Sequence, residues 1–262
     1  MSYEYKSIVV EKKDGIAVVT LNEPKTLNSL IQSMFDDLAV AAVELDKDDE
    51  VKVVVLTGAG KAFCAGGDLN RFKEGFDMVS GVDYVDNIHP FIKNWFDMRK
   101  PTIAAVNGAA TGAGMSLALL CDMAIASDKA KIGCAFINMA LVPDCALAWV
   151  LPRVIGVQKA KELIYTGRLV GAEEAEKIGL FNCVVPAESL MDEVMKLAGR
   201  LAKGPSYAIR MCKRIINMGL DMDLNNLLSL ESVIQTGCLC SEDSSEAVNA
   251  FLGKRAPVFK GR

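Results

Sequence analysis

The sequence predicts an α/β fold in which a sheet-containing core is followed by a purely helical region. Two observations support this expectation. Apolar, β-branched runs alternate with helically spaced segments up to about residue 185, and only helical spacing follows Pro186. Such an order indicates a layered core with a helical appendage. We therefore assign residues 1–200 to the core and residues 201–262 to a C-terminal helical region.

The composition is that of an ordinary globular protein. The chain has 262 residues, of which 51% are apolar and 24% charged, and its formal net charge is −4. This acidic balance argues against a nucleic-acid partner. We see no apolar run of membrane-spanning length and no signal pattern, so we expect no membrane association and a cytoplasmic location. The eight cysteines form no CxxC pair, which predicts reduced core thiols and no metal site.

Local signals place the individual elements. Residues 7–11 and 16–21 flank an Asp-Gly turn and predict a hairpin, and residues 52–57 and 102–106 predict buried strands. Helical spacing covers residues 34–45 and, after Pro90, residues 91–96. Residues 70–84 have no clear period, which fits either a flexible lid over a pocket or a variable surface loop. The remaining predicted elements are helices at 160–165, 172–178, 187–202, 206–218, 224–237 and 243–252, and a strand at 182–185.

Two predicted strands run directly into turns of small residues. AFCAGGDL at 62–69 follows the strand at 52–57, and NGAATGAG at 107–114 follows the strand at 102–106. We call these turns the first and second elbows. A strand that passes through glycines into a helix leaves backbone N–H groups free at the positive end of the helix dipole. Each elbow therefore suits an oxygen that becomes negatively charged during a reaction.

A single carboxylate interrupts a long apolar stretch downstream of the second elbow. Asp144 has no formally charged neighbour from Ala135 to Pro152. An acid in such surroundings is a candidate site residue with a raised pKa. The alternative is that Asp144 is the N-cap of a helix that Cys145 begins, since Asp is a favourable N-cap residue.

With both elbows and Asp144 in place, the chain resembles the crotonase family, the enoyl-CoA hydratase/isomerase superfamily. The elbows, the segment YTGRLVGAEEAEKIGLFNCVV at 165–185 and FLGKRAPVF at 251–259 carry this resemblance along nearly the whole chain. It implies a spiral of ββα turns, a helical C-terminal region that forms homotrimers or homohexamers, and a coenzyme A thioester as substrate. It also implies that the N–H groups of Gly67 and Ala113 hold the thioester oxygen.

The resemblance also indicates a reaction. Hydratases of the family carry two glutamates, at positions that are Ser116 and Phe136 here. Family isomerases carry one Asp or Glu at the position of Asp144, and the chain is most similar to 1,2-epoxyphenylacetyl-CoA isomerase-like members. We therefore expect an enoyl-CoA isomerase of fatty-acid or aromatic degradation that moves protons with Asp144. The alternatives are a hydratase, an aryl-CoA dehalogenase or hydrolase with Asp144 as nucleophile, and a non-catalytic acyl-CoA- or partner-binding protein.

Other residues are assigned by the same resemblance. His89 is the only histidine and would assist a nucleophilic Asp144, although it also fits a simple helix start before Pro90. No cofactor is expected, because coenzyme A is part of the substrate, and no metal is expected. The residues expected to bind substrate are Lys25, Ala65, Asp68, Leu69, Met115, Phe136, Leu147, Trp149 and Lys254, with Ser116 as a further candidate.

Overall fold

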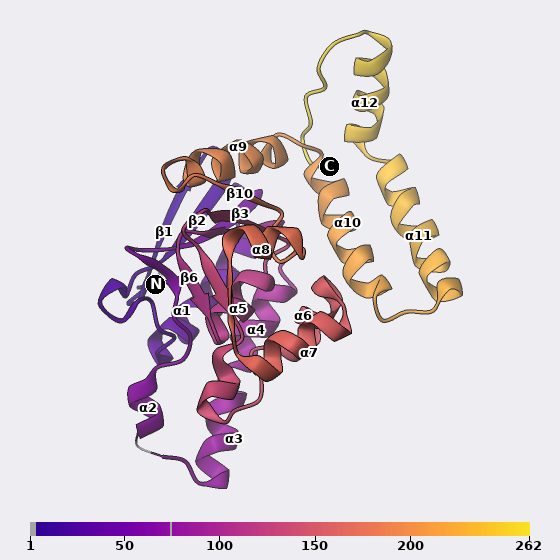
Figure 1. Ribbon diagram of the computed structural model, residues 1–262. Coiled ribbons are helices and arrows are strands. Elements are labelled where there is room, and N and C mark those ends of the chain that lie inside the picture. The colour runs from indigo at the N-terminus through magenta and orange to yellow at the C-terminus, as the bar shows by residue number, and fades with distance from the viewer. Residues whose placement is uncertain (1–3, 74) are drawn as a thin grey trace.

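A computed structural model describes residues 4–73 and 75–262, and two sheets form its centre (Figure 1). The larger sheet has six strands in the order β1-β2-β3-β5-β7-β10, parallel except for the antiparallel β1–β2 hairpin. The smaller sheet has the order β4-β6-β8-β9. The strands are β1 (Ile8–Lys13), β2 (Ile16–Leu21), β3 (Val53–Gly58), β4 (Ala62–Cys64), β5 (Thr102–Val106), β6 (Ala109–Thr111), β7 (Met123–Ser127), β8 (Lys131–Gly133), β9 (Leu169–Gly171) and β10 (Cys183–Val185).

The chain winds between the two sheets in a repeating ββα pattern. β3, β5 and β7 belong to the large sheet, and each is followed directly by a strand of the small sheet, namely β4, β6 and β8. Helical segments then return the chain to the large sheet. This confirms the predicted α/β spiral. The sequence predicted neither the small sheet nor β7. The strands of the small sheet have three residues each, too few to show a period.

Helices cover both faces of the large sheet. On one face α1 (Gln32–Lys47) packs against α4 (His89–Phe96), and the main hydrophobic core lies beneath them. On the other face α9 (Leu190–Ala202) buries Leu190, Val194 and Ala198 against β2, β3, β5 and β7. Because both faces are covered, β3 and β5 are buried along nearly their whole length, as the sequence predicted.

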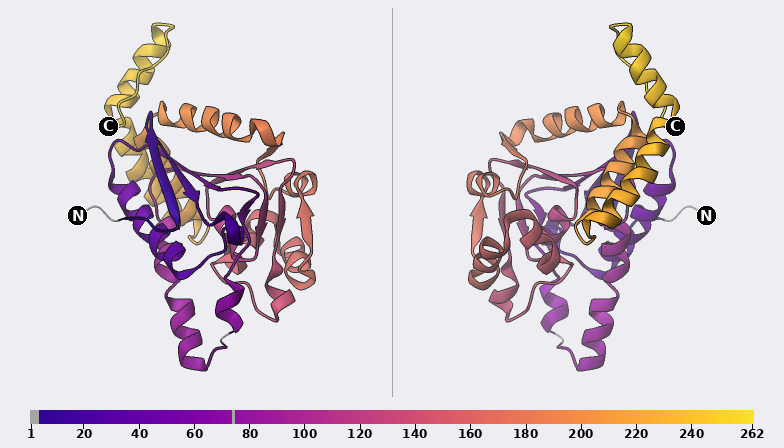
Figure 2. Two further views of the ribbon diagram at one scale, coloured as in Figure 1. Left: turned by 90° about the vertical axis from the view of Figure 1, so that its left-hand side faces the viewer. Right: turned by 90° about the vertical axis from the view of Figure 1, so that its right-hand side faces the viewer.

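The segment at 70–84 folds into helices despite its lack of a clear period. It forms α2 (Leu69–Lys73) and α3 (Met78–Asp86), which lie at the end of the molecule farthest from the C-terminal helices (Figures 1 and 2). Asp77 accepts a hydrogen bond from the Ser80 N–H at 2.8 Å and starts α3 with a capping box. The expectation of an irregular stretch was therefore wrong, and the spacing of Asp77 and Ser80 was the overlooked signal.

Three helices leave the core at the C-terminal end of the chain. α10 (Ser206–Gly219), α11 (Leu224–Leu239) and α12 (Glu242–Leu252) form an arm beside the core, and α12 projects beyond it (Figures 1 and 2). α10 and α11 contain no buried residue. α9, in contrast, still packs on the sheet, so the proposed boundary at residue 200 falls close to the end of α9 at Ala202.

The other α-helices lie between strands in the part of the chain that runs from β6 to β10. They are α5 (Ala113–Leu119), α6 (Leu147–Ile155), α7 (Val157–Thr166) and α8 (Ala172–Lys177). Among the described residues, none of the helices combines the length and the apolar character needed to cross a membrane. All eight cysteines are free, but only four are buried, so the expected core location holds for half of them.

Candidate active site

The first elbow is held in place by the segment that precedes α1. The N–H of Leu30 donates to the carbonyl of Gly66 at 2.7 Å, and the N–H of Ala65 donates to the carbonyl of Leu27 at 3.0 Å. Thr111 links the two elbows, because its hydroxyl donates to the carbonyl of Ala65 at 2.9 Å. The first elbow therefore has fixed backbone partners on both sides.

The second elbow reaches the first through positions that only glycine can occupy. A Cβ on Gly114 would lie 2.1 Å from the carbonyl oxygen of Cys64. Gly66 has a φ of +99°, and a Cβ there would lie 2.7 Å from the carbonyl oxygen of Thr111. A side chain at either position would push the elbows apart. Ala113 is the first residue of α5, so its N–H has no acceptor within the helix.

A cavity of about 230 Å³ lies against both elbows. Gly67, Ala113 and Asp144, which come from three different parts of the chain, all line it. The structure thus brings together the three residues that the sequence assigned to catalysis. Asp144 is the only carboxylate among the described residues that line the cavity. The other lining residues are mainly apolar and include Phe35, Leu69, Phe72, Tyr84, Ile88, Phe136, Met139 and Leu141.

Asp144 is half-buried, and its Oδ1 is buried without a hydrogen-bond partner in the described part of the chain. Burial raises the pKa of the Asp144 carboxyl above its usual value. A hydrogen bond with the Cys145 thiol lowers this pKa, but by less than burial raises it. A carboxylate in such a place is poorly solvated, so it binds a proton more readily than an exposed aspartate. It is therefore better suited than an exposed aspartate to taking up and releasing a proton.

Asp144 does not cap a helix. α6 begins at Leu147 with Ala146 as its N-cap, and no side chain makes a cap hydrogen bond there. Cys145 and Ala146 have positive φ values of 49° and 61°, which makes a tight turn between Asp144 and the helix. This turn separates the carboxylate from the helix N-terminus. The N-cap interpretation of Asp144 was wrong.

The two positions at which family hydratases carry glutamate lie close to the site. Ser116 is fully buried, and its hydroxyl donates a long hydrogen bond of 3.3 Å to the backbone carbonyl of Asp144. Phe136 lines the cavity itself. Ser116 therefore supports the Asp144 backbone and Phe136 provides an apolar wall. Neither residue supplies a second acid.

The predicted substrate-binding residues divide into three groups. Ala65, Leu69 and Phe136 line the cavity. Met115 and Leu147 are fully buried in the core around it, so they shape the site from behind. The remaining predicted residues do not line the cavity: Lys25, Asp68, Trp149 and Lys254.

His89 lies apart from Asp144. Its side chain is 66% exposed, and its Nδ1 is 3.5 Å from the Asp86 carboxylate. It lines a different, shallow hollow together with Phe96 and Trp149. The structure therefore does not bring His89 next to the carboxylate that it was expected to assist.

Sequence reasoning missed several residues that line the cavity, among them Phe72, Tyr84 and Asn138. Phe72 and Tyr84 come from α2 and α3, and Asn138 comes from the 3-10 helix at Ala135–Met139. The first two were overlooked because residues 70–84 were not assigned to helices. The spacing of Asp77 and Ser80, which form the capping box at the start of α3, would have been the signal.

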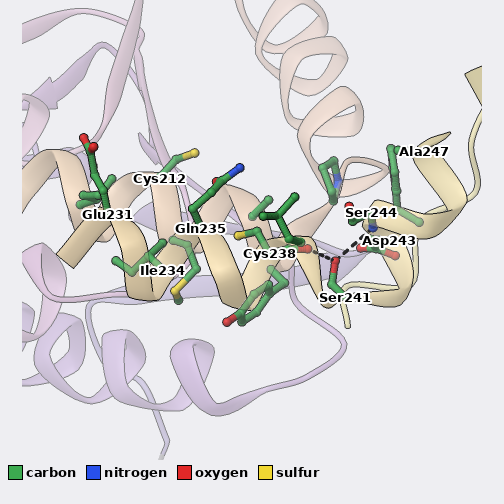
Figure 3. A pocket seen from close by; sticks show the side chains of 16 residues that line it. Cys212, Glu231, Ile234, Gln235, Cys238, Ser241, Asp243, Ser244 and Ala247 are labelled. Carbon is green, nitrogen blue, oxygen red and sulfur yellow. Dashed lines mark hydrogen bonds between the residues drawn. The ribbon is translucent and has the colours of Figure 1, made fainter. Parts of the chain in front are cut away.

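A second, larger hollow of about 550 Å³ lies between α10, α11 and α12 (Figure 3). Two of its polar side chains, Ser241 and Asp243, are already engaged in local structure. The Ser241 hydroxyl donates to the carbonyl of Cys238 at 2.7 Å and accepts from the Ser244 N–H at 3.0 Å. The buried carboxylate of Asp243 accepts from the N–H groups of Lys260 and Gly261 at 2.6 and 2.8 Å. This hollow offers no free, buried acid or base.

Comparison with known proteins agrees with the fold. Residues 11–262 match the family model described as enoyl-CoA hydratase/isomerase. The chain is 37% identical to a probable enoyl-CoA hydratase of Mycobacterium tuberculosis, over 98% of this chain and 99% of that protein. It is 39% identical to the 1,2-epoxyphenylacetyl-CoA isomerase of Escherichia coli, over 97% of each. An enoyl-CoA hydratase structure from Geobacillus kaustophilus superposes with a TM-score of 0.94 at 35% identity, covering 99% of this chain and 100% of that one.

Proposed function

We propose that this chain, which belongs to the enoyl-CoA hydratase/isomerase family, is an isomerase that moves a carbon–carbon double bond in an acyl-CoA thioester. One observation carries the proposal. The cavity beside the two elbows contains a single carboxylate, Asp144, and one oxygen of that carboxylate is buried without a partner among the described residues. A reaction that needs only one base therefore suits this site best.

The proposed reaction is a proton shuttle. The Asp144 carboxylate takes a proton from the α or γ carbon of an enoyl-CoA, and the electron pair of the broken C–H bond moves toward the thioester oxygen. The resulting dienolate is stabilised by the N–H groups of Gly67 and Ala113. Asp144 then returns the proton two carbons away, so that the double bond moves and no atom is gained or lost. Two fixed donors in a dry site stabilise the oxygen, and losing one costs about 10²–10³ in rate.

The surroundings of Asp144 support its double role. A group that must first accept and then donate a proton works best when its pKa is near the working pH. Burial moves the pKa of Asp144 in that direction. The apolar walls formed by Phe136, Leu141 and Met139 limit the access of water to the dienolate. Asp144 therefore reprotonates the dienolate, and deuterium enters the product from D₂O whenever the carboxyl proton of Asp144 exchanges with the solvent first.

Hydration is the main alternative, because most of the similar proteins are named as enoyl-CoA hydratases. Adding water across a double bond by the paired-carboxylate route needs two groups. One carboxylate acts as a base and activates the water, and a second carboxyl group acts as an acid and protonates the carbon. Ser116 and Phe136 stand where those acids are expected, and neither can do this work. The nucleophile alternative depends on a histidine beside Asp144, and His89 lines another hollow. Both observations favour the isomerase.

We further propose that the chain assembles into a homotrimer or homohexamer through the C-terminal arm. Large apolar side chains on α10 and α11 are exposed, with Ile216 at 63%, Leu224 at 68% and Val233 at 73%. An arm with so little burial of its own gains stability when a second copy covers these side chains. Sedimentation velocity measured over a range of protein concentrations tests this assembly.

The isomerase and hydratase reactions are distinguished by their products. The protein is incubated with a 3-enoyl-CoA and, separately, with the corresponding 2-enoyl-CoA, and the products are separated and weighed by mass spectrometry. We expect the two double-bond isomers to interconvert without any change in mass. A 3-hydroxyacyl-CoA product, heavier by one water, formed at a comparable rate would overturn the proposal.

A further inference from the structure

Tyr84 places a phenolic hydroxyl beside the first elbow. It comes from α3 and lines the same cavity as Asp144. A Cβ built on Gly67 would lie 3.9 Å from the Tyr84 hydroxyl oxygen and 3.2 Å from the Phe72 ring. The hydroxyl is therefore next to the backbone that is proposed to hold the thioester oxygen.

Neighbouring rings hold the Tyr84 ring in this position. Its centroid lies 6.0 Å from that of Phe72 in an edge-on arrangement and 5.2 Å from that of Phe76. The Arg71 guanidinium lies 4.4 Å from the Phe76 centroid and packs on the outer side of the cluster. Such aromatic contacts stabilise the position of the ring beyond the effect of its buried area. The hydroxyl is thus presented by a packed cluster, and it makes no hydrogen bond to any other described residue.

The electrostatics of Tyr84 make it a donor. Burial raises its pKa to about 12, and the negative charge of Asp144 adds to the increase. The hydroxyl therefore stays protonated well above neutral pH. Tyr84 and Asp144 thus have complementary roles in one cavity, since Asp144 can accept a proton and Tyr84 can donate a hydrogen bond.

We propose that the Tyr84 hydroxyl donates a hydrogen bond to the thioester oxygen of the bound acyl-CoA, as a third donor beside the N–H groups of Gly67 and Ala113. This makes Tyr84 a catalytic residue, because it touches the atom that gains negative charge. A hydrogen bond to a charged oxygen is stronger than one to a neutral oxygen, so the contact strengthens as the dienolate forms. The catalytic part of this inference depends on the proposed function, whereas the binding part does not.

The binding contact is tested with two ligands that differ only at the thioester carbonyl. Hexanoyl-CoA carries the oxygen, and S-hexyl-CoA, a thioether, lacks it. Calorimetry gives the ratio of their dissociation constants for the wild type, for Tyr84→Phe and for Tyr165→Phe. Tyr165 is 68% exposed on α7, so its variant controls for the loss of a hydroxyl elsewhere. We expect Tyr84→Phe to reduce the preference for hexanoyl-CoA about 2–10-fold, and Tyr165→Phe to leave it unchanged.

The catalytic contact is tested by deuterium uptake into an enoyl-CoA in D₂O. We expect Tyr84→Phe to slow the uptake about 10–100-fold, because the lost hydrogen bond is to a charged oxygen. A preference ratio in Tyr84→Phe equal to that of the wild type overturns the inference, whatever the uptake rate. A changed ratio in a wild-type protein that takes up no deuterium supports the contact and contradicts only the proposed isomerase function.

Discussion

Two hollows of this molecule differ in a way that shows what makes a site. The hollow between the C-terminal helices has a volume of about 550 Å³, more than twice that of the cavity beside the elbows, at about 230 Å³. Yet the carboxylate of Asp243 in the large hollow is bonded to two backbone N–H groups, whereas Asp144 in the small one keeps a buried oxygen unbonded. Unused polar groups, rather than volume, mark the site of chemistry.

The same contrast holds for what surrounds each hollow. The small cavity is built on glycines that bring backbones into contact, and it lies inside the packed core. The large hollow lies between helices α10 and α11, and no residue of either helix is fully buried. Groups that must be held in fixed positions are best placed on rigid elements. The comparison therefore predicts that substitutions in the small cavity change activity strongly and those in the large hollow do not.

The largest effect is expected from Asp144→Asn. The substitution keeps the shape of the side chain and removes the base, so isomerisation should fall about 10²–10⁴-fold, the usual contribution of a general acid–base group. Acyl-CoA affinity should change little, because the elbows remain. Steady-state rates and calorimetric binding of hexanoyl-CoA measure the two quantities separately. A variant with more than a tenth of the wild-type rate would remove Asp144 from the mechanism.

Asp144→Asn should also change stability, in the opposite direction. Because the folded-state pKa of Asp144 is raised, its ionisation opposes folding at any pH above that value. Asn carries no charge, so the variant should melt at a higher temperature than the wild type at pH 8. This difference should shrink as the pH falls through the folded-state pKa and disappear below about pH 4, where the aspartate is protonated in both states. Scanning calorimetry across this pH range measures it.

Gly114→Ala is expected to damage both the fold and the site. The added methyl group would meet the Cys64 carbonyl at 2.1 Å, so β4 and α5 must separate. We expect a loss of about 1–3 kcal/mol of unfolding free energy and a large loss of activity, since Ala113 moves with α5. Gly199→Ala is the matched control, because Gly199 lies in α9 with open space around it. It should gain up to about 1 kcal/mol, and urea denaturation compares the two variants.

His89→Ala should have a small effect. The imidazole is exposed and lines a separate hollow. We expect the isomerisation rate to stay within about twofold of the wild type, since substitutions of exposed groups away from a site have minor effects. A loss of more than tenfold would instead favour the dehalogenase or hydrolase alternative, in which a histidine assists Asp144.

The smallest effect is expected in the large hollow. Cys238→Ser changes a partly buried thiol on α11 without changing the size of the side chain much (Figure 3). The isomerisation rate of the variant, divided by the concentration of protein in the same assembly state as the wild type, should equal that of the wild type. A clear loss of rate, with the assembly state unchanged in sedimentation, would show that the large hollow takes part in activity and would break the comparison.

Much of the fold could be predicted because its buried strands and amphipathic helices have strong periods. The strands at Ile16–Leu21 and Thr102–Val106 begin and end where the sequence placed them. The small sheet was missed, because a strand such as Ala62–Cys64 is too short to alternate and is defined by its partner β6. Tertiary pairing, rather than local preference, determines such strands.

The candidate site was predictable where it rests on backbone requirements. The glycines marked the elbows, the family resemblance then selected Gly67 and Ala113 within them, and Asp144 was found by its isolation in an apolar run. The resemblance also selected Trp149 and His89, but these two residues line another hollow. Tyr84 was missed because its position depends on the packing of α2 and α3, which no local period revealed.

The central claim, that buried Asp144 is the base, is tested most directly by the pH dependence of deuterium uptake from D₂O into an enoyl-CoA. Uptake by the wild type should be lost as the pH falls through an apparent pKa above the usual value for aspartate, because a protonated carboxyl cannot accept a proton. The carboxyl ¹³C signal of Asp144 is identified in the wild-type spectrum as the one that is missing from the Asp144→Asn spectrum. This signal should titrate with the same pKa as deuterium uptake. Equal uptake and an equal pH profile in the wild type and in Asp144→Asn would contradict the account.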